Sequence, residues 1–485
     1  MFITAGTFWI FFVATVALYH LLPVNVRWTV LLFASLAFYG YWEIGFLFLL
    51  LGHVAWVYLW TRFMDGLPAG GRRRAVAWIA AGGPLLTLLV FKYGRMALDA
   101  VGSLLRGSGS DPLFTSWKLL VPIGISFYTF KTISYVVEVY RRRIHAERNP
   151  GILALYVAFF PQVLAGPIDR PNDLIPQLRR PRRINPDDLS AGALRITWGL
   201  FKKLVVADRL AYFVGFVFDS PAYQGLNLLF AAYLFAFQIY CDFSGYSDIA
   251  IGLCRILGID SAENFDRPYL SRGLSRFWAS WHMTLSRWFR DYVFLPMTYA
   301  VMRRIRGEKL WGIKAETWGY GLSILLTMTL CGLWHGAAWN FVFWGSLYGL
   351  LLTVSVATRK LRRRLVRMTG LNGHPRLHAA LSVFWTFNLV SLAWIFFRSA
   401  SLDKAFLYLK YMKVKVNGLG FAHLVFDLIL VAVFLILESL GRRWPDMPRL
   451  RKIPAPLKLA AAALFVCLIA ILAVNAANEF IYVRF

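Results

Sequence analysis

The sequence predicts an all-α polytopic membrane protein with about 11–13 transmembrane helices and additional re-entrant or interfacial helices. Three observations support this class. Apolar runs long enough to cross about 30 Å of hydrocarbon recur from one end of the chain to the other. The runs lack the period-two alternation of β-strands, and helices satisfy their own backbone hydrogen bonds in lipid. Arginine clusters lie between the runs rather than within them.

Composition supports the same class and excludes several others. The 485 residues include 53 Lys and Arg against 25 Asp and Glu, a net charge of +28, yet 58% of the residues are hydrophobic. A basic and apolar chain keeps these two properties in different regions, which excludes an ordinary soluble enzyme and a disordered basic tail. Binding of nucleic acid needs a basic face on a soluble fold, and the apolar runs exclude such a fold. The four cysteines lie in apolar stretches without a CxxC pair, so neither disulfides nor a zinc site is expected.

The expected spans are justified in chain order by their apolar runs. The first three runs are short, and the first is expected to be a retained span because no positively charged segment precedes it. The expected spans cover residues 7–22, 28–42, 46–61, 75–93, 118–138, 192–218, 226–256, 317–335, 339–357, 379–397, 421–440 and 457–477.

The loops between the runs predict the orientation in the membrane. Arginine clusters such as 72–74, 141–143 and 179–183 alternate with loops that carry no Lys or Arg, such as 107–116 and 219–225. This alternation places the arginine clusters in the cytoplasm and the neutral loops outside. The loop 398–420 breaks the pattern with five Lys and Arg. Either the span count is wrong there or that face meets an anionic partner.

Two segments do not fit simple spans. Residues 151–190 begin apolar, become rich in proline and end in arginines, and both ends are expected in the cytoplasm. Residues 264–300 mix tryptophans and arginines, which predicts an amphipathic helix at the interface or lining a funnel. We expect both segments to be re-entrant or interfacial. The chain is interpreted as one membrane domain, 1–485, with N-terminal helices 1–140, a catalytic core 141–357 and C-terminal helices 358–485.

His335 is the strongest candidate for catalysis. Ionisable groups inside membrane spans are rare and indicate function. The residue lies between Trp334 and Gly336 in an apolar stretch, with Asn340 shortly after. The segment offers no acidic residue and no second histidine to complete a metal site, whereas an imidazole can act as a general base near neutral pH. The alternative is a structural histidine at a helix break.

A second candidate group surrounds His282 on the expected amphipathic helix. If His282 faces the same cavity as His335, it could orient substrate or share in proton transfer, and a structural role is the alternative. Trp281 lies on the apolar face of this helix and is expected to line the chamber. Arg287 and Arg290 are expected to face the entrance for an anionic substrate.

The third group lies in the apolar run 226–256. Carboxylates and hydroxyls in such a run need polar partners, water or an opening. One interpretation is a wall of the reaction chamber, and the other is a buried network that holds helices together. The residues concerned are Asp242, Ser244, Tyr246 and Asp248.

The candidate groups lie in three stretches, QIYCDFSGYSDIAIG (238–252), ENFDRPYLSRGLSRFWASWHMTLSRWFRDYVFLP (263–296) and GLWHGAAWNFVFWG (332–345). Together these stretches resemble one family, the membrane-bound O-acyltransferases (MBOAT), in its bacterial branch of alginate O-acetyltransferase and D-alanyl-teichoic-acid transfer proteins. EFIYVRF (479–485) is similar to the end of chains in that branch, and PQVLAGPIDR (161–170) to its proline-rich cytoplasmic stretch.

The resemblance implies a fold, a chemistry and a set of partners. It implies a ring of helices around a thinned membrane core, where an inner tunnel meets a funnel from the opposite side at a histidine. The histidine of the WHG motif matches His335, and that of WHMTLS matches His282. The implied donor is acetyl-CoA or the pantetheine thioester of an acyl carrier protein, with no permanently bound cofactor. Indole N–H groups or Asn340 could stabilise the oxyanion.

The sequence therefore predicts an O-acetyltransferase that moves an acyl group from a cytoplasmic thioester across the inner membrane to an extracytoplasmic polysaccharide such as alginate. The expected partners are membrane lipid, the polysaccharide and an extracytoplasmic acetyltransferase or relay protein, without nucleic acid. One alternative is D-alanyl or other acyl transfer to a cell-envelope polymer. Others are a proton-coupled transporter that uses His335, Asp242 and Asp248 as a relay, and a scaffold subunit of a secretion complex.

Overall fold

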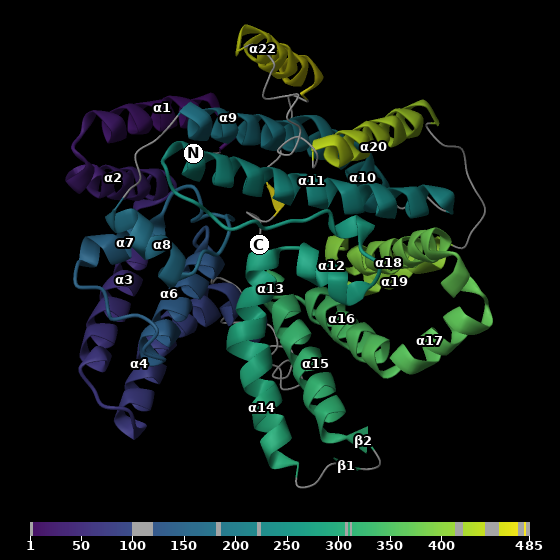
Figure 1. The fold of residues 1–485 in the computed structure, drawn as a ribbon, viewed down its shortest axis with the longest axis horizontal. Coiled ribbons are helices and arrows are strands. Elements are labelled where there is room, and N and C mark those ends of the chain that lie inside the picture. Colours follow the sequence, from purple (N-terminus) through teal and green to yellow (C-terminus); the bar gives the residue numbers. More distant parts are fainter. Residues whose placement is uncertain are drawn as a thin grey trace, which may run out of the picture.

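The computed structural model is an assembly of helices (Figure 1). It describes residues 3–98, 120–180, 186–220, 225–305, 309–310, 313–412, 421–441, 455–473 and 480–481. In these ranges the only strands are β1 (Lys309–Leu310) and β2 (Ile313–Lys314), which pair antiparallel. The prediction of an all-α membrane protein is confirmed.

Each expected span contains a helix in its described part, although several helices begin or end inside the expected bounds. The α-helices are α1 (Gly6–Leu21), α2 (Arg27–Gly40), α3 (Ile44–Asp65), α4 (Gly71–Leu88), α6 (Ile125–Tyr140), α7 (Pro150–Ala158), α8 (Pro171–Arg179), α9 (Pro186–Leu200), α10 (Asp208–Asp219), α11 (Leu226–Ile256), α12 (Leu274–Ser280), α13 (Met283–Phe289), α14 (Leu295–Arg304), α15 (Ala315–His335), α16 (Trp339–Ala357), α17 (Arg359–Met368), α18 (Pro375–Arg398), α19 (Leu402–Tyr411), α20 (Phe421–Gly441) and α22 (Ala455–Leu472).

Helix length separates clear spans from shorter segments. In the part of the chain that the structure describes, 5 helices are long and apolar enough to cross a membrane. Shorter apolar helices, such as α1 with 16 residues, account for other expected spans. The loop 107–116 and the arginines Arg182 and Arg183, which support the predicted orientation, lie outside the described residues. The five candidate spans are Ile44–Asp65, Gly71–Leu98, Leu226–Ile256, Trp339–Ala357 and Pro375–Arg398.

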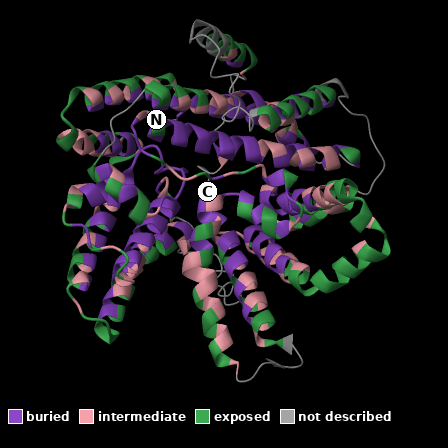
Figure 2. Cartoon of the chain, in the orientation of Figure 1, coloured by how far each residue is buried: buried purple, intermediate pink, exposed green. Residues whose placement is uncertain are grey.

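Burial is concentrated in the middle of the molecule, where α11 crosses it (Figure 2). The outer helices instead expose large apolar side chains, among them Phe33, Phe48 and Trp78. A soluble protein rarely exposes so many apolar side chains, whereas lipid tails solvate them without cost. The protein therefore turns an apolar surface to lipid and keeps many of its charged and polar side chains inside.

The segment 151–190 contains two helices that are too short to span. The helices α7 and α8 have 9 residues each, which corresponds to about 14 Å of rise. The loop between them is held by a buried chain of contacts. Lys131 Nζ donates to Gln162 Oε1 at 2.8 Å, and Gln162 Nε2 donates to Asp169 Oδ2 at 2.5 Å. The backbone N–H of Ile168 donates to Thr284 Oγ1 at 3.1 Å, which fixes this loop beside α13.

Glycines allow the helices next to the candidate histidine to pack closely. A Cβ atom added to Gly332 on α15 would lie 2.1 Å from the carbonyl oxygen of Phe341 on α16. One added to Gly345 would lie 2.1 Å from the carbonyl oxygen of Met328. Since both neighbours are backbone atoms, only glycine fits at either position. The close crossing of α15 and α16 sets the place of His335 at the end of α15.

Candidate active site

His282 lies at a break between two short helices. The sequence predicted one continuous amphipathic helix through this region, and that prediction is wrong. Helix α12 ends at Ser280, Trp281 is extended, and His282 has a left-handed backbone with φ of +41° before α13 begins. A left-handed conformation is costly for a histidine, so the surrounding contacts must stabilise it.

Asn264 supplies those contacts. Its side-chain Oδ1 accepts hydrogen bonds from Thr284 N at 3.2 Å and Thr284 Oγ1 at 2.9 Å, and it lies 3.0 Å from His282 Nδ1. Its backbone carbonyl accepts from Met283 N at 2.8 Å. Because an amide oxygen only accepts, Nδ1 of His282 carries the hydrogen, and the neutral ring keeps its lone pair on Nε2. The fully buried imidazole is thus fixed in both orientation and tautomer.

His335 is the last residue of α15 and is 2% exposed. Its ring centroid lies 4.8 Å from that of Trp334, 5.2 Å from that of Trp344 and 5.2 Å from that of Phe397. Trp334 also contacts His282, at 6.3 Å between ring centroids. The two histidines therefore border the same indole, and the structure brings together the two residues that the sequence singled out.

Two indole N–H groups beside His335 are available as donors. Among the residues that the structure describes, no protein acceptor lies within hydrogen-bonding distance of Nε1 of Trp334 or of Trp344. Asn340 is arranged differently, because its Nδ2 donates to the carbonyls of Phe396 at 3.2 Å and Ser399 at 2.9 Å. Its two amide hydrogens thus tie α16 to the end of α18. Of the two expected kinds of oxyanion donor, the geometry favours the indoles.

A lysine missing from the sequence-based candidates lies in this site. The helix that begins at Gly71 widens into a π-helical turn at Leu89–Tyr93. There Lys92 Nζ donates to the carbonyl of Trp334 and, at 3.2 Å, to Ser126 Oγ. Tyr93 Oη donates to the carbonyl of Leu333 at 2.7 Å. Such π-turns are frequent at functional sites. The signal that could have found Lys92 is an ionisable residue inside the expected span 75–93.

Of the polar residues predicted to line the chamber, those on α11 pair with a different part of the protein. Lys203, on the π-helical turn Phe201–Ala207, lies 2.8 Å from Asp242, and Lys202 contacts both Ser244 and Asp248. These contacts correspond to the buried network that the sequence left open as the alternative to a chamber wall.

The C-terminal segment joins the same network. The backbone N–H of Ile481 donates to Asp242 Oδ2 at 2.8 Å, and the ring of Phe480 lies 5.0 Å from that of Tyr246. The residues of α11 that reach the His282 site are instead Phe243, with its ring 4.6 Å from the imidazole, and Ser247, which accepts from Asn264 Nδ2 at 3.0 Å.

Comparison with known proteins shows the family. The model of MBOAT, the membrane-bound O-acyltransferase family, matches residues 112–402. The chain belongs to the membrane-bound O-acyltransferase family. The matched range includes His282, His335 and the α11 network, whereas Lys92 lies before it. The protein is therefore an acyltransferase, and the prediction of a multi-pass membrane protein of this family is confirmed.

The relatives of this chain are named for different polymers. The chain is similar to the probable alginate O-acetylase AlgI of Azotobacter vinelandii, with 32% identity over 446 residues, 89% of this chain and 84% of the relative. The probable alginate O-acetylase AlgI of Pseudomonas aeruginosa is 35% identical over 390 residues, 80% of this chain and 70% of the relative. The peptidoglycan O-acetyltransferase of Helicobacter pylori is 30% identical over 426 residues, 82% of this chain and 75% of the relative.

The remaining site predictions concern the residues that flank His282. Trp281 is 1% exposed and packs in an aromatic core, with its ring 5.0 Å from that of Trp394. Arg287 is exposed on α13. Arg290 begins the π-helical turn Arg290–Phe294, is exposed, and donates from Nε to Asp291 Oδ1 at 2.8 Å. Both arginines thus lie on the surface of this acyltransferase.

Proposed function

We propose that the protein takes an acetyl group from a cytoplasmic thioester and passes it across the bacterial inner membrane to a hydroxyl on the outer side. The donor is acetyl-CoA or the pantetheine arm of an acyl carrier protein. The acceptor belongs to an exopolysaccharide such as alginate, reached directly or through an extracytoplasmic relay protein. The observation that carries the proposal is His335, a buried imidazole between two indoles in a membrane-embedded acyltransferase.

The proposed chemistry uses His335 as the general base. Its imidazole takes the proton of the acceptor hydroxyl while the hydroxyl oxygen attacks the thioester carbonyl carbon. The negative charge that develops on the carbonyl oxygen is stabilised by Nε1–H of Trp334 and Trp344, which have no other protein partner among the described residues. When the C–S bond breaks, the thiolate leaves and takes the proton from the imidazolium. A thioester carries its own activation, so the step needs no metal.

The other site residues have supporting roles in this proposal. His282 holds the reacting hydroxyl through Nε2, because Nδ1 is committed to Asn264. The buried position of both imidazoles keeps water from the thioester. Arg287 and Arg290 attract the phosphate-bearing donor.

The test is polymer acetylation in cells that carry His335→Ala at the protein level of the wild type. We expect acetylation to fall to background. Acetylation at the wild-type level would contradict the assignment of the base, and a silent His335→Ala with a strong deletion phenotype would instead indicate a scaffold.

A vesicle experiment separates the enzyme from a transporter. Purified protein in lipid vesicles, supplied with acetyl-CoA on one side and a polysaccharide on the other, should transfer acetyl groups without net movement of solute. Solute flux coupled to protons, without acyl transfer, would favour the transporter.

A further inference from the structure

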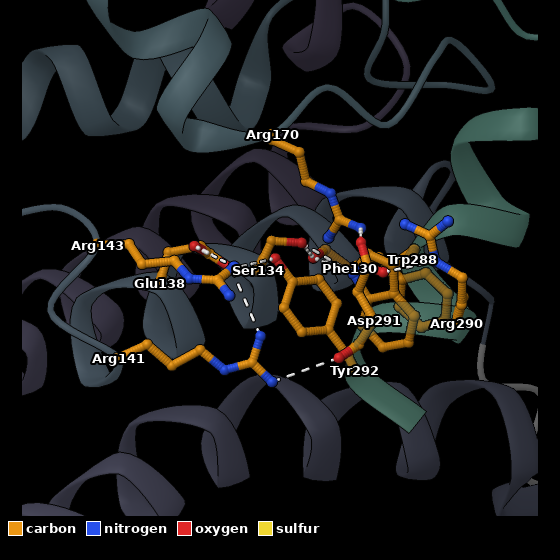
Figure 3. Close-up of polar contacts among 10 residues, drawn as sticks. All are labelled: Phe130, Ser134, Glu138, Arg141, Arg143, Arg170, Trp288, Arg290, Asp291 and Tyr292. Atoms are coloured by element: carbon orange, nitrogen blue, oxygen red, sulfur yellow. Dashed lines mark hydrogen bonds and ion pairs between the residues drawn. The ribbon is translucent and has the colours of Figure 1, made fainter. Parts of the chain in front are cut away.

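Four arginines gather around Tyr292 and Asp291 where α6 ends (Figure 3). Arg170 Nη2 lies 2.9 Å from Asp291 Oδ2, and Arg141 Nη2 donates to the backbone carbonyl of Asp291 at 3.3 Å. Arg290 Nε donates to Asp291 Oδ1 at 2.8 Å. The guanidinium carbons of Arg170 and Arg141 lie 4.3 and 5.5 Å from the ring centroid of Tyr292. The fourth, Arg143, pairs with Glu138 at 3.4 Å.

The carboxylates of this cluster do not neutralise it. Four guanidinium groups face two carboxylates, Glu138 and Asp291, which leaves a formal charge of +2. Nη1 of Arg170 is buried and has no hydrogen-bond partner in the described part of the chain. A buried guanidinium N–H without an acceptor is costly, and an anionic ligand would satisfy it.

The cluster is also accessible. The side chains of Arg141 and Arg290 are 29% and 60% exposed. The sequence places residues 141–143 on the cytoplasmic side. An anion that arrives from the cytoplasm can therefore reach these guanidinium groups.

A continuous run of aromatic rings leads from the cluster to His335. The ring centroid of Tyr292 lies 5.3 Å from that of Trp288, which stacks on Phe130 at 3.8 Å. Phe130 in turn lies 5.4 Å from Trp334, the neighbour of the catalytic candidate. Trp288 Nε1 donates to Ser134 Oγ at 2.8 Å, which holds the run against α6. This aromatic wall of packed, largely buried rings connects the cationic cluster with the indole beside the buried imidazole.

We propose that Arg141, Arg170 and Arg290 bind the phosphate of a phosphopantetheine thioester, while its acyl-bearing arm lies along this aromatic wall. The proposal rests on the proposed function and adds the part of the donor that is recognised. Guanidinium groups match phosphate oxygens in geometry and charge, and bidentate contacts to them are among the strong hydrogen bonds of proteins. The phosphate is shared by coenzyme A and by the arm of a carrier protein, so the site does not distinguish these two sources.

The experiment compares three acetyl donors with purified protein in vesicles of zwitterionic lipid. The donors are acetyl-CoA, acetyl-4′-phosphopantetheine and acetyl-pantetheine, the last of which has no phosphate. For the wild type, we expect similar KM values for the first two donors and a KM about tenfold or more higher for acetyl-pantetheine. In Arg170→Gln and Arg290→Gln, the KM for the two phosphorylated donors should rise about tenfold, with kcat within about twofold and the KM for acetyl-pantetheine unchanged.

The controls separate this proposal from its rivals. Arg363→Gln changes an exposed arginine on α17 and should leave all three KM values as in the wild type. If Arg170→Gln fails to fold, Arg290→Gln still tests the proposal, because the side chain of Arg290 is mostly exposed. An equal wild-type KM for acetyl-pantetheine and acetyl-phosphopantetheine would overturn the phosphate site but leave the proposed function standing. If the arginine variants lose acetyl transfer only in vesicles with anionic lipid, the cluster binds lipid headgroups instead of the donor. Absence of transfer with every donor, when a cell-envelope extract that contains the polysaccharide and its relay proteins is supplied as acceptor, would refute both proposals.

Discussion

Lys92 Nζ donates a hydrogen bond to the carbonyl oxygen of Trp334, the residue immediately before His335. Together with the bond from Tyr93 to Leu333, it satisfies two successive carbonyls in the last turn of α15, which have no partner within the helix. The π-helical turn makes this possible because it presents two consecutive side chains to the same neighbouring helix end. We therefore interpret Lys92 as a positioning residue for His335.

The first prediction concerns Lys92→Met, which keeps the length of the side chain and removes the donor. The end of α15 would lose its anchor, and a shift of about 1 Å in a catalytic group can cost about 100-fold in rate. We expect acetyl transfer in vesicles to fall about 10- to 100-fold while the protein stays folded. Lys92→Arg, which keeps a charged donor, should recover part of the rate, and Tyr93→Phe should cost about fivefold. Equal rates for Lys92→Met and the wild type would exclude the positioning role.

The second prediction concerns Asn264→Ala. This change removes the acceptor that fixes the tautomer of His282 and also releases both donors of Thr284. Loss of buried hydrogen bonds of this kind costs about 1–3 kcal/mol each when a partner is left unsatisfied. We expect a lower unfolding temperature in detergent and a rate of acetyl transfer at least tenfold below that of the wild type. Ser247→Ala removes only the contact to Asn264 Nδ2 and should have the smaller effect. A larger loss of stability and rate in Ser247→Ala than in Asn264→Ala would contradict this interpretation.

The helices could be predicted from the sequence because lipid imposes long apolar runs. The breaks within them could not. The left-handed backbone of His282 is stabilised by Asn264, 18 residues earlier in the chain, which supplies acceptors to the residues from His282 to Thr284. The spacing of Phe277, Trp281, Leu285 and Trp288 suits one helical face, and all four are buried, but periodicity carries no information about a tertiary hydrogen bond that interrupts the helix.

The residues of the candidate site could likewise be predicted only in part from the sequence. His335 and His282 were found because ionisable side chains are rare in apolar stretches. For Asp242, the sequence left a chamber wall and a structural network open, because its partner Lys203 is 39 residues away and on another helix. Lys92 lies in the apolar run 75–93, which by its hydropathy indicates only a membrane span. The apolar context locates buried polar residues, and only their contacts separate catalytic from structural ones.

The third prediction tests the structural network through Lys203→Met. The ammonium of Lys203 lies 2.8 Å from the carboxylates of both Asp208 and Asp242, and all three side chains are buried. Removing the cation that bridges two buried carboxylates should destabilise the protein by about 3–5 kcal/mol. A Lys203→Met, Asp242→Asn double variant should regain part of this loss. The measurements are thermal unfolding in detergent and acetyl transfer per amount of folded protein, which we expect to stay close to the wild type. A strong loss of rate without loss of stability would instead place Asp242 in the reaction chamber.

The fourth prediction concerns the crossing of α15 and α16 next to the active site. In Gly332→Ala, the new Cβ atom would lie 2.1 Å from the carbonyl oxygen of Phe341 and 3.0 Å from Cα of Gly345. Backbone atoms cannot move aside as a flexible side chain can, so the helices must separate, at a cost of about 1–3 kcal/mol. Since His335 lies only one helical turn further on, the same displacement should also lower the rate of acetyl transfer.

The matched control for this variant is Gly52→Ala, in the membrane helix α3, where a Cβ atom would meet nothing within 4 Å. Alanine in an open helix interior is favoured over glycine by about 0.5–1 kcal/mol, so this variant should be slightly stabilised. The two glycine replacements are therefore expected to change the unfolding temperature in opposite directions, with only Gly332→Ala losing activity. If both variants unfold at or above the wild-type temperature, the tight crossing does not hold His335 in place, because α15 and α16 would then tolerate a wider separation without loss.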